Sequence, residues 1–198
     1  MENTSNLHVN ERKCKSLTIC KSDPVDISLN GVNKVETLTV LGVTFSSRAS
    51  WSTHVDNIVR NVSRRFYVAR ILRPSLSSDN MKLLYFSFLR SLIEYCAPLL
   101  VGMSKSDANR LDRLQRRFHR LLCGSDCVLE CLPSLSERRR ELTLKFLKKV
   151  IDPNHVLNHL LPPVSSSERF ILLARRTTRR SESFLLASTL LFNECLKR

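Results

Sequence analysis

Polar and apolar residues alternate in two short stretches near the start of the chain, which is the pattern of half-buried β-strands. The alternation predicts strands at residues 15–21 and 26–29, and a run rich in β-forming residues predicts a third at 35–45. The dipeptide Asn30-Gly31, directly after the second strand, is a strong signal for a tight turn. Gly42 falls inside the third predicted strand, where a glycine indicates a bulge or the close approach of another segment.

From residue 50 onward the apolar residues recur every three or four positions, as they do on one face of a helix. This spacing predicts helices at residues 51–73, 79–97, 104–123, 134–152 and 184–196. Pro74, Gly124 and Pro153 are expected to end the first, third and fourth of them. The pairs Ser104 with Asp107 and Ser134 with Glu137 have the spacing of capping boxes.

The helix predicted at residues 79–97 is apolar nearly all round, so we expect it to be the central, buried helix of the fold. Arg90 and Glu94 lie in the middle of its apolar stretch. Such charges are costly at the centre of a bilayer. Because they are one helical turn apart, they predict an ion pair in a buried helix rather than a membrane span.

These elements together predict a mainly α fold with a short N-terminal β segment (α+β). The changes of period and the linker signals divide the chain into four regions, at residues 1–49, 50–124, 125–163 and 164–198. The first holds the strands, the second a three-helix bundle and the third a helical extension. The fourth is a basic linker followed by a terminal short helix.

Positive charge is the strongest signal in the composition, with 32 Lys and Arg against 18 Asp and Glu and a formal net charge of +14. Such an excess indicates a polyanionic partner, which is nucleic acid or an anionic membrane surface. A basic surface without a partner is the alternative. The net charge alone does not decide between these interpretations. The arrangement of the arginines along the helices is the further evidence.

Four arginines of the helix at residues 104–123 are spaced three and four apart, and therefore share one face. They are Arg110, Arg113, Arg117 and Arg120. Arg60 and Arg64 form a similar pair on the helix at residues 51–73. Few acids lie between these arginines, so the pattern favours contact with nucleic-acid phosphates over a solvated helix face. For the arginines at 138–140, which Glu137 and Glu141 flank, a solvated face is the favoured interpretation.

Metal and thiol chemistry have weak support in the sequence. His119, Cys123, Cys127 and Cys131 are each four apart, which does not match the paired knuckles of structural zinc sites, and ordinary buried thiols are favoured. Cys20 and Cys96 are interpreted as core residues, and His54 as a polar-face or capping residue. The seven cysteines and the lack of a signal peptide predict an intracellular protein, nuclear or cytoplasmic and not secreted, with reduced thiols.

Several short motifs, in this order and at this spacing, resemble the end of the palm and the thumb of reverse transcriptases from non-LTR (LINE-type) retrotransposons. They lie at residues 41–45 (LGVTF), 50–55 (SWSTHV), 84–98, 110–117 (RLDRLQRR), 132–139 (LPSLSERR) and 179–193. The chain departs from the family at Ser91-Leu92, which replaces the second half of the usual Arg-Pro pair, and at Leu100 or Val101, where an aromatic is common. The resemblance covers nearly the whole chain from about residue 10 onward.

The resemblance implies a thumb-like helical bundle that follows a palm-end β-hairpin. Leu41 and Gly42 would belong to a hairpin that supports the primer end, as a primer grip does. The helices would track the backbone of an RNA or DNA template–primer duplex without reading its sequence. If the chain is part of a longer one, its missing palm and fingers would be further partners.

Nucleotide transfer in that family needs paired carboxylates that hold two divalent metal ions. They come from a single upstream aspartate and an Ala-Asp-Asp turn, and no Asp-Asp pair occurs in this sequence. We therefore expect a binding fragment with no catalytic residues, no membrane partner, no small-molecule substrate and no cofactor, Mg²⁺ belonging to an intact parent polymerase. The alternatives are a decayed element or partial gene model without function, and a helical protein-interaction domain co-opted by the host.

Overall fold

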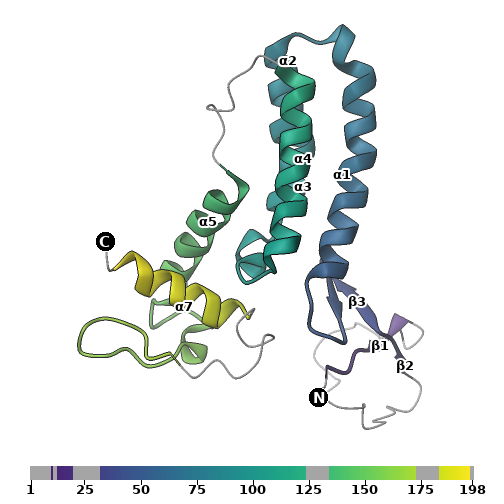
Figure 1. The fold of residues 1–198 in the computed structure, drawn as a ribbon. Coiled ribbons are helices and arrows are strands. Elements are labelled where there is room, and N and C mark those ends of the chain that lie inside the picture. The colour runs from purple at the N-terminus through teal and green to yellow at the C-terminus, as the bar shows by residue number, and fades with distance from the viewer. Residues whose placement is uncertain (1–9, 11–12, 20–31, 124–133, 173–182, 197–198) are drawn as a thin grey trace.

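The structure is a computed structural model that describes residues 10, 13–19, 32–123, 134–172 and 183–196 (Figure 1). It is mainly α-helical with a short N-terminal β segment, as the sequence predicted. In the part of the chain that is described, no helix is long and apolar enough to cross a bilayer. The predicted strand at 26–29, the turn at 30–31 and the stop at Gly124 lie outside the described residues.

A β-hairpin occupies the place where a single strand was predicted at residues 35–45. Strands β3 (Thr37–Val40) and β4 (Val43–Ser46) pair antiparallel, and Leu41 and Gly42 form the two-residue turn between them. The prediction of Gly42 inside a strand was therefore wrong, whereas the hairpin implied by the family resemblance is present. Two further short strands, β1 (Lys15–Ser16) and β2 (Asn33–Lys34), pair parallel with each other.

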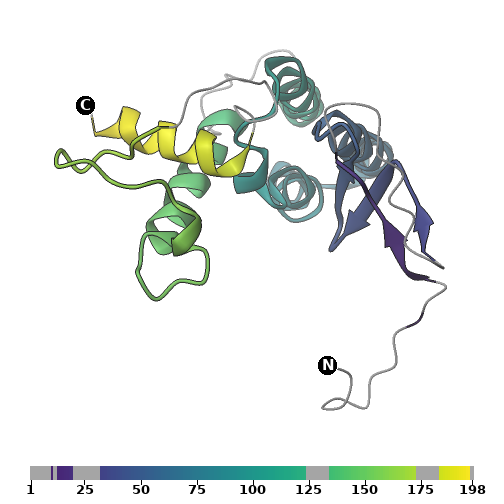
Figure 2. The ribbon, with the colours of Figure 1, turned by 90° about the horizontal axis from the view of Figure 1, so that it is seen from below.

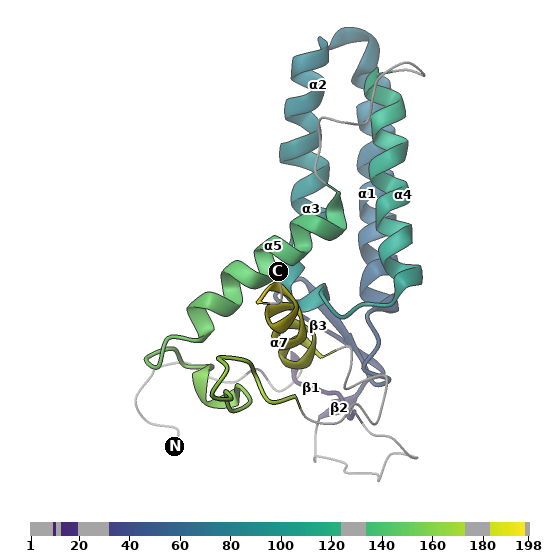
Figure 3. The same cartoon turned by 60° about the vertical axis from the view of Figure 1, so that its left-hand side comes forward.

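Three antiparallel rods of helix follow the hairpin (Figures 1 and 3). Helix α1 (Ser52–Leu72) leads away from the strands, and a 3₁₀ turn (Arg73–Ser75) reverses the chain. Helix α2 (Ser78–Leu84), a π-helical stretch (Tyr85–Arg90) and α3 (Ser91–Glu94) return as one rod. A 3₁₀ turn at Ala97–Leu100 then leads to α4 (Lys105–Cys123), which runs parallel to α1.

The core of this bundle lies between the three rods and is built from the apolar face that each one presents. Val55, Val62 and Phe66 come from α1, and Leu111 and Phe118 from α4. From the middle rod, the buried side chains are Met81, Tyr85, Leu89 and Ile93. The ring of Tyr85 stacks on that of Phe118 with centroids 4.8 Å apart, which is a favourable distance for an aromatic pair.

The middle rod differs from its prediction in two ways. It ends at Glu94 rather than near residue 97, because Cys96 takes a left-handed φ of 53° that α-helix does not allow. It is also not apolar-buried all round, since Leu83 is 67% and Phe86 45% exposed. Cys96 is half-buried at this turn and so is not the core residue that was expected. The predicted ion pair is confirmed, with Arg90 Nε and Glu94 Oε1 2.5 Å apart.

Both predicted capping interactions form at the helix starts. At α5 (Leu135–Val150), the Glu137 amide donates to Ser134 Oγ at 3.1 Å and Glu137 Oε2 accepts from the Ser134 amide at 3.3 Å. At α4, the Asp107 amide donates to Ser104 Oγ at 3.1 Å. Such caps satisfy backbone donors that the first turn leaves free.

The C-terminal part packs beside the bundle (Figure 2). Helix α5 contacts the turn at Ala97–Leu100, and α7 (Phe184–Cys195) packs on α5. The side chain of Asn193 in α7 binds the backbone of Phe170. Its Oδ1 accepts from Phe170 N at 3.0 Å, and its Nδ2 donates to Phe170 O at 2.9 Å. The arginines at residues 175–180 lie outside the described residues.

Candidate nucleic-acid interface

Helices α1 and α4 lie side by side and in a fixed register. Near their N-terminal ends, Arg110 of α4 forms an ion pair with Asp56 of α1. Near their C-terminal ends, Arg73 Nε donates to Leu121 O at 3.1 Å. Since the helices are parallel, residues one and two turns beyond Asp56 stand level with residues one and two turns beyond Arg110.

This register brings the two predicted arginine rows onto one face. Arg60 and Arg64 follow Asp56 by one and two turns on α1. On α4, Arg113, Arg117 and Arg120 follow Arg110 by one, two and three turns. All five side chains are exposed. We call the surface formed by these five residues the α1–α4 face.

The arginines of the α1–α4 face have no ion pair with any carboxylate among the described residues. Arg60 donates a long hydrogen bond of 3.4 Å to Asn57 Oδ1, which is a neutral acceptor. The guanidinium of Arg117 lies 4.4 Å above the ring of Phe66, so that the ring supports one side of it. Their positive charges therefore stay uncompensated within this part of the molecule.

Arg110 is placed differently from the other predicted arginines. It pairs with Asp56 and, at 3.3 Å, with Asp107 Oδ1 of its own helix. The hydrogen bond that Arg110 donates to Asp56 is the main reason that the pKa of Arg110 is raised. Asp107 is itself buried and also accepts from Ser52 Oγ at 2.9 Å. Arg110 is thus part of a polar cluster that joins α1 to α4.

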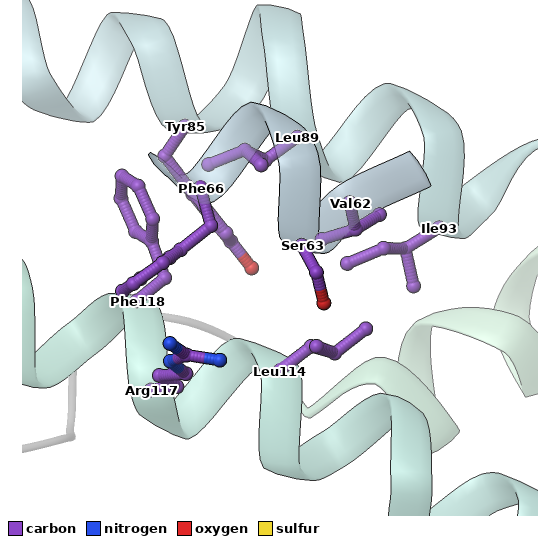
Figure 4. A pocket seen from close by; sticks show the side chains of 9 residues that line it. All are labelled: Val62, Ser63, Phe66, Tyr85, Leu89, Ile93, Leu114, Arg117 and Phe118. Atoms are coloured by element: carbon purple, nitrogen blue, oxygen red, sulfur yellow. The ribbon is translucent and has the colours of Figure 1, made fainter. Parts of the chain in front are cut away.

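A small cavity of about 10 Å³ lies beneath Arg117, enough for a single water molecule (Figure 4). The hydroxyls of Tyr85 and Ser63 both point toward α4 at this cavity. The Tyr85 hydroxyl is buried and has no hydrogen-bond partner. Burial raises the pKa of Tyr85 to about 12, so the phenol stays protonated and the cavity carries no negative charge.

The predicted primer-grip residues form the tip of the hairpin. Leu41 and Gly42 have φ of 49° and 81°, as a tight hairpin turn of this type requires. Tyr95 holds the tip from the side, with its hydroxyl donating to Leu41 O at 2.7 Å. A Cβ on Gly42 would stand 3.4 Å from the Tyr95 ring. The Leu41 side chain is 85% exposed, so the fold presents an apolar side chain at this tip.

A chain of hydrogen bonds connects the hairpin to the arginines of α1. Thr39 Oγ1 and Thr44 Oγ1 are 3.2 Å apart, and Asn57 Nδ2 donates to Thr44 Oγ1 at 3.1 Å. Asn57 also accepts from Arg60. These contacts place the hairpin and the α1 end of the α1–α4 face in one connected unit.

His54 is buried beneath the hairpin, and the expectation of a polar-face or capping residue was wrong. Its Nδ1 accepts from the Thr44 amide at 3.3 Å, and it is 3% exposed. Burial lowers its pKa, so the neutral form is the one that the fold accommodates. The pairing of His54 with a strand amide depends on tertiary packing that sequence periodicity does not contain.

The arginines of α5 are used inside the molecule. Arg138 pairs with Glu141 at 3.2 Å and lies 3.8 Å from Glu94, and Arg140 pairs with Glu194 of α7 at 3.2 Å. Arg139 is 8% exposed, and burial lowers its pKa. Arg138 and Arg140 are partly exposed, as the predicted solvated face requires, whereas Arg139 is buried.

Among the described residues, no three His, Cys, Asp or Glu side chains are grouped closely enough to hold a metal ion. His119 contacts the edge of the Tyr85 ring, with centroids 6.2 Å apart. Cys127, Cys131 and the side chain of Cys123, three members of the set considered for zinc, lie outside the described residues.

Three residues that the sequence analysis did not select lie on or beside the α1–α4 face. Arg116 is exposed next to Arg113 and Arg120 on α4, and Arg70 and Tyr67 are exposed on α1. The same helical spacing that selected Arg60 and Arg64 would have found them.

No protein family, no curated protein and no solved structure matches this chain.

Proposed function

We propose that this chain is a thumb-like nucleic-acid-binding module, of the kind that follows the palm in non-LTR retrotransposon reverse transcriptases. Its α1–α4 face binds the phosphate backbone of an RNA or DNA template–primer without reading the base sequence. The observation that carries the proposal is the convergence of two arginine rows, from α1 and α4, on one face without carboxylate partners among the described residues.

Phosphate binding explains features of this face that packing does not require. Guanidinium groups present several donors and match phosphate oxygens in geometry. The five arginines extend along parallel helices, so they suit a linear row of phosphates better than a single small anion. Arg110, which Asp56 and Asp107 already neutralise, serves instead to hold the two rows in register.

The proposal assigns no nucleotide transfer to these residues. No two aspartates are adjacent in the sequence, and Asp56 and Asp107 of the bundle serve as an ion-pair partner and a helix cap. In an intact parent polymerase, the hairpin tip at Leu41 and Gly42 would lie toward the primer end. The Mg²⁺ ions would be held by the palm of that polymerase.

The test is the salt dependence of binding to a labelled duplex, followed by fluorescence anisotropy. If each of the five arginines neutralises one phosphate, the slope of log affinity against log salt is about −3.5 to −4.5, at 0.7 to 0.9 per contact. A slope near zero, or no binding at low salt, would overturn the proposal.

A helical protein-interaction domain is the second candidate, and one observation favours it. Leu83 and Phe86 form an exposed apolar pair on the middle rod of the bundle. Such pairs are common at protein contacts. A chain that folds cooperatively but binds no nucleic acid at any salt concentration would support this candidate over the first.

A further inference from the structure

Tyr67 lies on the α1 side of the α1–α4 face, about one turn beyond Arg64. It follows Asp56 by eleven residues, which is three helical turns, and Ser63 by one turn, so it lies on the same line of α1. Phe66, the preceding residue, supports the guanidinium of Arg117 on α4. Tyr67 is therefore level with Arg117 and on the outer side of it.

The Tyr67 ring is available to a ligand. Its side chain is 65% exposed, and it has no aromatic partner and no hydrogen bond among the described residues. Aromatic side chains elsewhere in the bundle are used in packing, as Tyr85 and Phe118 are. Ile71, one turn further along α1, is 59% exposed and extends the apolar surface beside the ring.

Exposed arginines surround this ring. Arg64 and Arg70 lie three residues before and after it on α1, and Arg117 and Arg120 lie across the helix pair. An aromatic ring within a row of phosphate-binding groups is the arrangement by which proteins hold single strands, because bases stack on the ring while cations follow the backbone. In a paired duplex the faces of the bases are covered, so such a ring finds a stacking partner only where bases are unpaired.

We propose that Tyr67 is a stacking platform for an unpaired base, so that the α1–α4 face prefers single-stranded nucleic acid, or a single-stranded template overhang, to fully paired duplex. Arg70 contributes a phosphate contact next to it. This inference rests on the proposed function, because it adds a base contact to a face already assigned to the backbone.

The experiment compares two single strands of equal length and equal phosphate count with a fully paired duplex. An oligothymidine, an abasic strand that has no bases, and a fully paired duplex are each titrated by fluorescence anisotropy at about 0.1 M salt. We expect the oligothymidine to bind the unsubstituted chain about fivefold or more tightly than the abasic strand, since stacking of one base contributes at least this factor. The duplex should bind less tightly than the oligothymidine.

Substitutions then assign the preference to one ring. Tyr67→Ala should abolish the difference between oligothymidine and abasic strand, whereas Tyr67→Phe, which keeps the aromatic face, should retain it. Val68→Ala is the matched control, because Val68 is the next residue, is 44% exposed, and lies about 100° further round the helix. This control should leave all three affinities unchanged.

The outcomes separate this inference from the proposed function. Equal binding of the oligothymidine and the abasic strand, with a steep salt dependence, would overturn the stacking role of Tyr67 and leave backbone binding in place. A base preference that survives in Tyr67→Ala would also overturn it. Failure to bind any of the three probes would overturn the proposed function itself.

Discussion

The arginines of α5 and those of the α1–α4 face have similar spacing in the sequence but different surroundings in the fold. On α5, Arg138 and Arg140 meet glutamates, and Arg139 is buried. On the α1–α4 face, by contrast, no carboxylate among the described residues pairs with Arg113 or Arg120. The arginines of α5 therefore take part in intramolecular contacts, and those of the α1–α4 face remain available to a ligand.

This difference comes partly from Glu141 of α5 itself and partly from the elements that pack against each helix. Glu94 and Glu194, which meet Arg138 and Arg140, come from α3 and α7. On the other side of the bundle, Asp56 of α1 pairs with Arg110 and with no other described arginine. Helix α1 contains no further acid beyond Asp56. A row of arginines thus indicates a binding surface only when neighbouring elements bring no carboxylates to it.

The largest effect is expected when four of the five arginines of the α1–α4 face are removed together. A chain with Arg60→Gln, Arg64→Gln, Arg113→Gln and Arg120→Gln should bind duplex about 10³-fold more weakly at about 0.1 M salt. Each phosphate contact raises log affinity by roughly 0.7 to 0.9 when the salt falls tenfold, from about 1 M to about 0.1 M, and the variant loses four such contacts. The slope of log affinity against log salt should become shallower by about 3. Anisotropy titrations at several salt concentrations measure both.

The control for this experiment is a chain with Arg138→Gln and Arg140→Gln on α5. It loses charge of the same kind, but from groups that already have carboxylate partners. Its salt slope should match that of the unsubstituted chain. If the two sets of substitutions weaken binding in proportion to charge alone, the distinction between the two regions does not hold.

The next effect is on folding and is expected on the α5 side. Glu94 is 21% exposed, accepts from Arg90, which is 7% exposed, and lies near Arg138. Glu94→Gln leaves the buried Arg90 guanidinium without a counter-charge, which should lower the free energy of unfolding by about 3 kcal/mol. Chemical denaturation measures the loss. A matched Glu141→Gln, at an exposed pair, should cost less than about 0.5 kcal/mol.

The helices and their caps could be predicted because their signals are local. The apolar spacing of α1 and the capping box at Ser134 and Glu137 need no information from the rest of the chain. The hairpin at Leu41 and Gly42 was missed although the sequence carries a signal for it. The apolar positions shift from even numbers, at 38 and 40, to odd numbers, at 43 and 45, on the two sides of the turn. The early end of the middle rod at Cys96, by contrast, carries no local signal of its own.

The candidate site could be predicted only in part, for the same reason. Helical spacing placed Arg113, Arg117 and Arg120 on one face of α4. The surroundings of the arginine row also depend on contacts between residues far apart in the sequence, such as the ion pair of Asp56 with Arg110. Because this pair depends on the parallel packing of α1 and α4, the sequence did not reveal that Arg110 is neutralised.

A smaller effect is expected at the hairpin tip. Gly42→Ala places a side chain at a φ of 81° and within 3.4 Å of the Tyr95 ring, so the free energy of unfolding should fall by about 1 to 2 kcal/mol. Gly102→Ala is the control, since Gly102 does not have a positive φ. Duplex affinity should change little in either variant, because both leave the five arginines in place. A large loss of affinity in Gly42→Ala with intact folding would instead join the hairpin tip to the binding face.

The smallest effect is expected beneath Arg117, where a buried polar group has no partner, in contrast to the paired Arg90. Tyr85→Phe removes a hydroxyl that forms no hydrogen bond in the structure. The free energy of unfolding should therefore stay unchanged or rise by up to about 1 kcal/mol, because a buried hydroxyl without a partner is unfavourable. Tyr95→Phe is the matched control, since it removes the donor to Leu41 O and should cost about 0.5 to 1 kcal/mol. A loss of more than about 1 kcal/mol in Tyr85→Phe would mean that a bound water in the cavity joins Tyr85 to Ser63, and that the interior on this side is as fully paired as on the other.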